Sequence, residues 1–252
     1  CFLDTDNFIE EKNFLKIHYK ALQDKNVSFA YCKYYSYSNV KGWLNKYFAA
    51  IGGNDPIAYF FNKNDRLPYL AEFTSDNNLK ISKKKNEYTI ISFKNIKKTI
   101  GANGFFIKKK KYSIFKSYDP KNFLHIDTNI KALEAQKIKK FALINSEITH
   151  QTSDGLLKNL VKRIKYFDEF YFNMYQKRTF KIIDLRTKKD LLKLFLLIIS
   201  SFSLIFPLFF SIFKTLKTKK IAWLLHVFLI NLFIFTYAYI SLKLFIKKIC
   251  NV

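Results

Sequence analysis

The sequence predicts an α/β fold followed by two C-terminal membrane helices, and three observations support this prediction. The 252 residues are 49% apolar, enough for the core of one large domain or two small ones. Up to residue 175, runs typical of strands alternate with runs of helical periodicity, which indicates layered helices and sheet. Beyond Asp190 the chain carries eight Lys, no acidic residue and two long uncharged runs.

Strand and helix candidates alternate along the first part of the chain. Runs rich in Val, Ile, Tyr and Phe predict a strand that ends near residue 4 and further strands at residues 27–35, 88–93, 104–109 and 140–145. Apolar residues on one helical face predict helices at residues 10–22, 39–51, 128–136 and 156–167, and one that starts at Pro56.

The two uncharged runs predict membrane helices. Residues 194–213 and 221–242 would extend about 30 and 33 Å at 1.5 Å per residue, close to the thickness of the hydrocarbon core of a bilayer. We place the helices at residues 191–213 and 221–246, after a basic juxtamembrane segment at residues 176–190. The alternative is a pair of buried helices in a soluble core.

Basic residues leave the membrane topology open. Six of them at residues 177–189 place the large N-terminal part in the cytoplasm. Four Lys at residues 214–220 would then lie outside in a simple two-pass hairpin. Either the positive-inside rule is broken, or the pair enters the membrane without fully crossing it. We expect Pro207 to kink the first helix, as membrane helices tolerate.

The charge and the cysteine content of the chain indicate which classes of partner and which compartment to expect. The 44 Lys and Arg against 19 Asp and Glu give a formal net charge of +25, which favours anionic partners such as phosphate groups or membrane lipid. Only four of the basic residues are Arg, whose planar guanidinium group binds phosphates and bases through paired hydrogen bonds, so we expect no nucleic-acid partner.

The three Cys lack CxxC spacing, which fits a reducing compartment. Because the chain begins with Cys1 and not Met, we expect a fragment or a processed chain.

The motif LDTDN at residues 3–7 follows an apolar strand end. Carboxylates at i and i+2 of an extended segment point the same way, so Asp4 and Asp6 can share one divalent cation. Mg²⁺ or Mn²⁺ would complete its shell with water and substrate phosphates. The alternative is a turn that caps the following helix, with Asp6 or Asn7 as N-cap.

A glycine-containing loop stands at residues 51–56. Gly52 and Gly53 permit close backbone approach, and Asp55 before Pro56 favours a turn. The loop lacks the Lys and spacing of a P-loop, so it is weak as a phosphate cradle and plausible as a substrate-side loop.

A second such loop, at residues 99–109, precedes a strand. Asn103 and Gly104 allow the backbone to approach a sugar, and the Asn amide can both donate and accept. A plain hairpin turn is the alternative.

Asp127 and His150 are the remaining candidates. Asp127 stands where a helix should begin, a position that stabilises the carboxylate anion that a general base needs. Helix capping is the alternative for Asp127. His150 ends a strand-like stretch, where a structural hydrogen-bonding role is the alternative to a catalytic one.

Taken in order, these motifs resemble the membrane-associated family 2 glycosyltransferases of the GT-A fold. The resemblance covers nearly the whole chain and is most specific at DTDN and between His125 and His150. It implies an incomplete GT-A-like mixed sheet with flanking helices over residues 1–175, without a counterpart of the family's nucleotide-binding first half.

The resemblance also implies residue roles. Asp4 and Asp6 would hold the metal ion and the donor diphosphate, and Asp127 would be the general base. The donor and acceptor sugars would contact Gly53, Asn54, Asp55, Asn103 and Gly104. The family's acidic pair is here Ile126 and Asp127, a single acid, and the Gln-x-x-Arg-Trp block of polysaccharide synthases is absent, which favours single-sugar transfer.

The activity implied is inverting, metal-dependent hexosyl transfer in polysaccharide biosynthesis. A nucleotide-sugar would be the donor and a glycan or lipid-linked hydroxyl the acceptor, at the cytoplasmic membrane face. A non-catalytic membrane-anchored basic protein that binds anionic lipid is the alternative, which explains the charge but not LDTDN. Nucleic-acid binding through interleaved Lys and aromatic residues is disfavoured by the few Arg.

Overall fold

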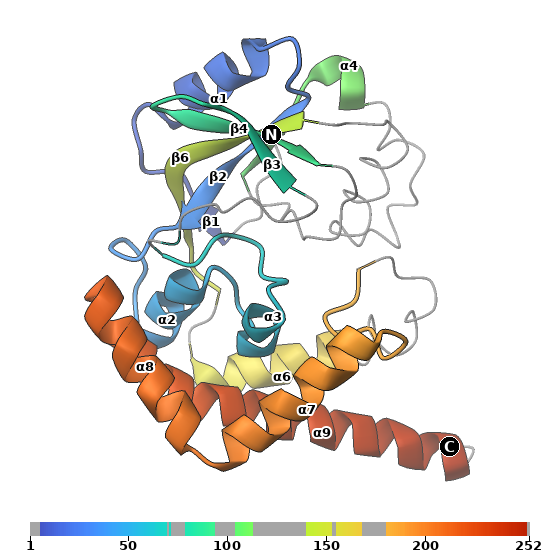
Figure 1. Cartoon of the computed structure of the whole chain (residues 1–252). Helices are drawn as coiled ribbons and strands as arrows, with labels where there is room; N and C mark the ends of the chain where they lie inside the picture. Colours follow the sequence, from blue (N-terminus) through green and yellow to red (C-terminus); the bar gives the residue numbers. More distant parts are fainter. Residues whose placement is uncertain are drawn as a thin grey trace.

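The sheet and the C-terminal helices lie at opposite ends of the molecule (Figure 1). The computed structural model describes residues 6–69, 71, 79–93, 104–112, 140–152, 155–167 and 180–250. Within these ranges the chain is mixed α/β with a mixed sheet and flanking helices, so the predicted fold class is confirmed at this level. The predicted strand before residue 5 and the predicted helix at residues 128–136 lie outside the described residues.

Six strands form the sheet, in the order β3-β4-β6-β2-β5, with β1 paired to the end of β6. Their bounds are β1 (Asn7–Phe8), β2 (Phe29–Tyr35), β3 (Leu79–Lys84), β4 (Tyr88–Phe93), β5 (Phe105–Ile107) and β6 (Lys140–His150). β3 is not among the predicted strands because its Lys residues interrupt the apolar pattern. It stands at the edge of the sheet, where Lys is tolerated and discourages pairing with other chains.

β6 is the central strand, and its residues Phe141 to Ile144 are all buried. It pairs in parallel with β2 and antiparallel with β4, and it runs to His150, five residues beyond the predicted end. Parallel pairing brings the carboxyl ends of β2 and β6 to the same edge of the sheet. At that edge the short antiparallel β1 sets Asn7 opposite His150.

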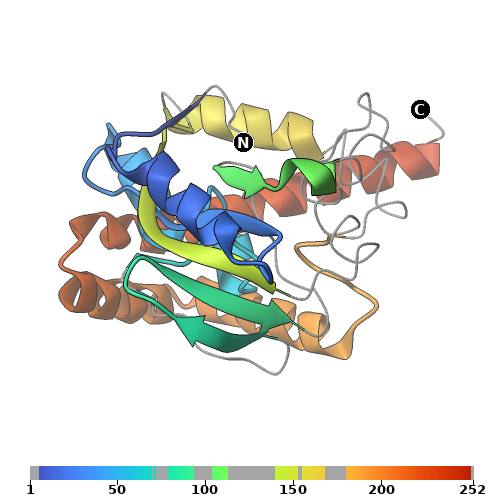
Figure 2. The same cartoon turned by 90° about the horizontal axis from the view of Figure 1, so that it is seen from above.

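The helices outside the C-terminal region agree with predicted ones, except for the short α4, which was not predicted. They are α1 (Phe14–Gln23), α2 (Trp43–Ile51), α3 (Pro56–Phe60), α4 (Lys109–Tyr112) and α6 (Leu156–Tyr166). α1 lies across one face of the sheet (Figures 1 and 2). Phe14 and Ala21, two turns apart on one face of α1, pack against Cys32 and Ala30 of β2.

The predicted membrane helix at residues 191–213 is not one straight helix. The structure divides it into α7 (Lys188–Phe202) and α8 (Ile205–Thr218), which meet at an angle of 91°. The break lies at Ser203 and Leu204, before Pro207, and Leu204 adopts a φ of 53°. A proline nitrogen cannot donate to the carbonyl four residues earlier, here that of Ser203, and its ring clashes with that carbonyl. The effect of Pro207 is therefore a sharp break and not the expected kink.

The second predicted membrane segment is helical throughout. It begins as the 3₁₀ helix η4 (Ile221–Leu225) and continues as α9 (His226–Cys250). Residues Ile221–Ile246 are long and apolar enough to cross a membrane. One side of α9 packs into the same buried cluster as α2 and α3, which includes Leu229, Phe233, Ile51 and Ile57.

Candidate functional site

A cavity of about 210 Å³ lies between the strand ends and the helices. Its walls come from the residue before β1, the loops on either side of α3, the end of β6, one side of α6 and the segment before α7. The lining includes Asp6, Gly53, Asn54, Asp55, Lys63, Asn64, Asp65, His150, Thr152, Asn159, Lys162, Arg163 and Tyr166. The lining contains both acidic and basic side chains, which suits a ligand that carries charge and several polar groups.

Asp6 and His150 meet at the edge of the sheet. The Gln151 amide donates to the Asp6 carbonyl at 2.8 Å, which continues the β1–β6 pairing. As a result, His150 Nε2 lies 3.5 Å from Asp6 Oδ2, and the Asn7 side-chain amide donates to Asp6 Oδ1 at 2.7 Å. The hydrogen bond from His150, opposed by burial and aided by nearby Lys162, holds the pKa of Asp6 below its ordinary value.

The alternative role of Asp6 and Asn7 as helix caps does not hold. α1 starts at Phe14, and its N-cap residue is Asn13, so both residues stand well before the helix. Asn7 lies in β1 opposite His150 instead. The register of two short strands therefore places Asp6 at the cavity.

The lowered pKa of Asp6 predicts an acid-dependent loss of stability. A carboxyl whose pKa falls below 3.8 on folding stabilises the fold above about pH 4, and this contribution is lost as the pH falls through the folded pKa. We expect His150→Ala to reduce the difference in the free energy of unfolding between pH 7 and pH 3. Urea unfolding at both pH values measures it. In an Asp6→Asn background, His150→Ala should leave this difference unchanged, and a persisting change would assign the effect to another group.

The loop at residues 52–55 forms as predicted, with α3 starting at Pro56. Gly52 ends α2 with a φ of 73°, in the left-handed region that glycine adopts most readily. A Cβ on Gly52 would lie 2.5 Å from the Arg66 carbonyl oxygen. The close backbone approach predicted for this glycine is thus made by the backbone at Arg66 and Leu67 of the same chain.

Asp55 anchors three parts of the fold from its buried position. Its Oδ1 accepts from the amides of Ile57 and Ala58 at 2.8 and 3.1 Å, as the N-cap of α3. Its Oδ2 accepts from the Tyr237 hydroxyl of α9 and lies 3.8 Å from Arg163 Nη1 of α6. Asp55 therefore lines the cavity with its carboxylate bound by three elements, and its predicted contact with a sugar stays a prediction.

α6 supplies one wall of the cavity, which sequence reasoning missed. Arg163 donates to the Asn54 carbonyl at 3.0 Å and to its side-chain oxygen at 2.7 Å, fixing the loop. Asn159, Lys162, Arg163 and Tyr166 stand at i, i+3, i+4 and i+7. This spacing puts polar side chains on one helical face and is the signal that could have identified the wall.

Of the remaining predicted site residues, Gly104 lies within the described ranges. Gly104 has a φ of 65° and packs in the core, where an added Cβ would lie 2.9 Å from Ile148 Cδ1. Gly104 is not among the cavity-lining residues. Asp4, Asn103 and Asp127 lie outside the described residues, so their predicted roles stay predictions.

The described residues fit a divalent cation only in part. Among them, no three His, Cys, Asp or Glu side chains come close enough to hold a metal ion. Asp6 and His150 nevertheless offer a carboxylate oxygen and an imidazole nitrogen side by side at the cavity. A cation with these two ligands would take the rest from water, phosphate oxygens or a further acid such as Asp4.

Comparison of the chain with models of known protein families, with characterised proteins and with solved structures gives no match.

Proposed function

We propose that the protein is an inverting, metal-dependent glycosyltransferase. It transfers a sugar from a nucleotide-sugar donor to a hydroxyl of a glycan or lipid-linked acceptor, at the cytoplasmic membrane face. The supporting observation is that Asp6, the loop at residues 53–55 and His150 line one cavity although they are far apart in sequence. The resemblance implied a metal-holding role for Asp6 and an acceptor-side role for the loop. A purely lipid-binding protein needs no such cavity.

The cavity residues suit the donor diphosphate. Asp6 is held as a carboxylate by His150, and Lys162 of α6 adds positive charge nearby. A divalent cation held by Asp4 and Asp6 would offset the negative charge of the diphosphate. Asn54, held by Arg163, presents its loop backbone to the cavity on the proposed acceptor side.

The proposed reaction needs one proton acceptor, for which Asp127 is the candidate. Asp127 takes the proton of the acceptor hydroxyl while that oxygen attacks the anomeric carbon from the face opposite the leaving group. The new bond joins the acceptor oxygen to the anomeric carbon. The bond from that carbon to the diphosphate breaks, and the diphosphate leaves with the electron pair.

Asp6→Asn in the intact protein tests the proposal. We expect Mn²⁺-dependent binding of UDP-sugars or GDP-sugars to weaken at least tenfold, because the neutral amide binds a cation poorly. Isothermal titration calorimetry with Mn²⁺ or with EDTA measures this binding. Asp184→Asn, which neutralises an acid outside the cavity, is the matched control and should bind as the wild type does.

A second variant in the same experiment addresses the proton acceptor. Asp127→Asn should abolish sugar transfer and leave donor binding nearly intact. Donor binding that needs no metal and is unchanged in Asp6→Asn would contradict the proposed function. Retained turnover in Asp127→Asn would mean that Asp127 is not the proton acceptor.

A further inference from the structure

The C-terminal helices form one layer at the end of the molecule remote from the sheet (Figure 1). α8 packs against α7, η4 and α9, while α9 also contacts α3 and α6. The layer is therefore attached to the globular part along its length and does not project from it.

α9 is buried along one continuous stripe. The buried side chains recur every three or four residues, and they are Leu229, Ile230, Phe233, Tyr237, Ile240 and Leu244. From His226 to Leu244 this stripe extends about 27 Å at 1.5 Å per residue. They belong to one cluster with residues of α2, α3 and α7, so protein covers this side of the helix along nearly the length of a membrane span.

Two hydrogen bonds fix α9 against the globular part. The Tyr47 hydroxyl of α2 lies 2.7 Å from His226 Nδ1, and both side chains are buried. The Tyr237 hydroxyl donates to Asp55, which lines the cavity. Tyr237 stands near the middle of the apolar segment, where a membrane span would lie about 15 Å below either surface of the hydrocarbon core. In a spanning α9, Asp55 and the polar cavity would have to enter hydrocarbon with it, which is prohibitively costly for charged groups.

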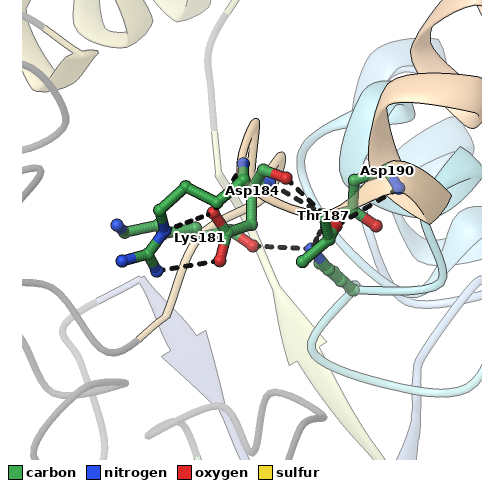
Figure 3. Close-up of polar contacts among 6 residues, drawn as sticks. Lys181, Asp184, Thr187 and Asp190 are labelled. Carbon is green, nitrogen blue, oxygen red and sulfur yellow. Dashed lines mark hydrogen bonds and ion pairs between the residues drawn. The ribbon is translucent and has the colours of Figure 1, made fainter.

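The bent pair α7–α8 is tied to the globular part at both ends. At its start, Asp190 accepts from Lys63 Nζ at 2.7 Å and from the Asp184 amide at 2.9 Å, and the Thr187 hydroxyl caps the helix (Figure 3). Both Lys63 and Asp190 are mostly buried. At its end, Lys220 Nζ lies 4.5 Å from the Tyr37 ring centroid and 4.7 Å from that of Tyr69. Because both ends meet the same body, they lie on the same side of any membrane that the bend enters.

The outward side of the layer is apolar. Phe202, Leu204, Ile205 and Phe206 at the bend are each more than half exposed. Other exposed apolar side chains on the three helices include Leu191, Leu192, Phe195, Ile199, Phe209, Phe213, Leu216, Phe228, Phe235, Tyr239, Leu242, Phe245 and Ile249. A patch of this size is far beyond what soluble monomers usually expose.

Lysine residues stand at the ends of the helices that carry the exposed apolar side chains. Lys188 and Lys189 stand at the start of α7, and Lys217 and Lys219 at the end of α8. No acidic residue follows Asp190 in the sequence. Apolar side chains flanked by Lys alone match the surface of an anionic bilayer, whose headgroups meet the lysines while the acyl chains cover the apolar groups.

We propose that α7, α8 and α9 form an in-plane docking surface that seats the protein on one leaflet of an anionic phospholipid bilayer, with no segment crossing it. The bend at residues 202–206 is the deepest point of insertion. The lysines at 188–189 and 217–220 then lie on one side, which removes the conflict between the positive-inside rule and a two-pass hairpin. This surface does not depend on the proposed enzymatic activity.

Cysteine labelling of the full chain tests the topology. Each variant carries one reporter cysteine. The three reporters are Asn39→Cys in the globular part, Lys217→Cys after the bend, and the native Cys250, which is exposed. Cys1 is replaced by Ser throughout, and Cys250 as well where another reporter is read, while Cys32 stays because it is buried. A membrane-impermeant maleimide is applied to spheroplasts and to sealed inverted vesicles of cells that express each variant.

All three reporters should react in vesicles of one orientation only, and in the same one. Reaction of Cys250 from the opposite side would mean that α9 crosses the bilayer. Reaction of Lys217→Cys opposite to Asn39→Cys would mean that α7–α8 crosses as one bent span. Either result overturns the proposal, as does recovery of the chain as a soluble oligomer without membrane.

Vesicle flotation tests the lipid surface itself. The purified chain should bind vesicles of phosphatidylcholine with 30% phosphatidylglycerol, about tenfold more tightly than pure phosphatidylcholine, because the Lys groups add attraction to anionic lipid. Phe206→Glu at the bend should weaken that binding about tenfold or more. Leu15→Glu on α1, similarly exposed but far from the layer, is the control and should bind as the wild type does, with circular dichroism confirming both folds. Equal binding by Phe206→Glu, or no preference for the anionic vesicles, would overturn the proposed surface.

Discussion

Replacing Asp55 by alanine should lower the free energy of unfolding by about 3–5 kcal/mol, the range found when one partner of a buried ion pair is removed. The carboxylate is 4% exposed and Arg163 is 11% exposed, so solvent screens the pair little. Alanine also leaves the amides of Ile57 and Ala58 without their cap and the Tyr237 hydroxyl without its acceptor. Urea unfolding followed by circular dichroism measures the change.

Matched variants separate the contributions at Asp55. Tyr237→Phe removes only the hydroxyl of α9 and should cost about 1–2 kcal/mol. Combined with Asp55→Ala, it should add little, because the two side chains share one interaction. Asp184→Ala breaks an exposed pair with Arg186 and should cost less than about 1 kcal/mol. If Asp55→Ala were no more costly than Asp184→Ala, the three-element anchor would not hold the helices together.

Replacing Gly52 by alanine should destabilise the protein by about 3 kcal/mol or more, since a strained φ and overpacking each contribute about 1–3 kcal/mol. Its Cβ would lie 2.5 Å from the Arg66 oxygen and 2.7 Å from the Leu67 oxygen. Both atoms belong to the backbone, which cannot rotate away as a side chain can. Thermal unfolding of the variant measures the loss.

Gly42 provides the control for Gly52. It also has a positive φ, 77° against 73°, although its ψ of 149° places it in an extended region that glycine adopts, and an added Cβ at Gly42 would meet nothing within 4 Å. Gly42→Ala therefore carries a conformational cost without overpacking, of about 1–3 kcal/mol. Equal losses in the two variants would mean that the loop at Arg66 and Leu67 moves aside and that the tight approach is unimportant.

The local elements were predictable because each depends on residues close in sequence. The helix at α1 follows from the spacing of its apolar residues, and the start of α3 follows from Asp55 before Pro56. β3 was not predictable in this way, because its position at the sheet edge and not its own pattern makes its lysines acceptable.

The candidate site was predictable only in its parts. Asp6, the loop at residues 53–55 and His150 were each identified from local motifs. Their meeting depends on the pairing of Asn7 with His150, a contact across more than a hundred residues. Arg163 and Tyr237 were missed because their importance arises from Asp55, which neither adjoins in sequence.

By itself the sequence determined the alternation of strands and helices, the excess of lysine and the apolar character of the C-terminal region, since composition and short-range periodicity encode all three. Which sides of the apolar segments are buried against protein and which stay exposed was decided by tertiary structure alone. That outcome depends on what covers each side of a helix, and for α9 the cover includes α3, well over a hundred residues earlier in the chain. A hydropathy profile shows how apolar a segment is. Which of its sides is buried depends on contacts with residues that are distant in sequence.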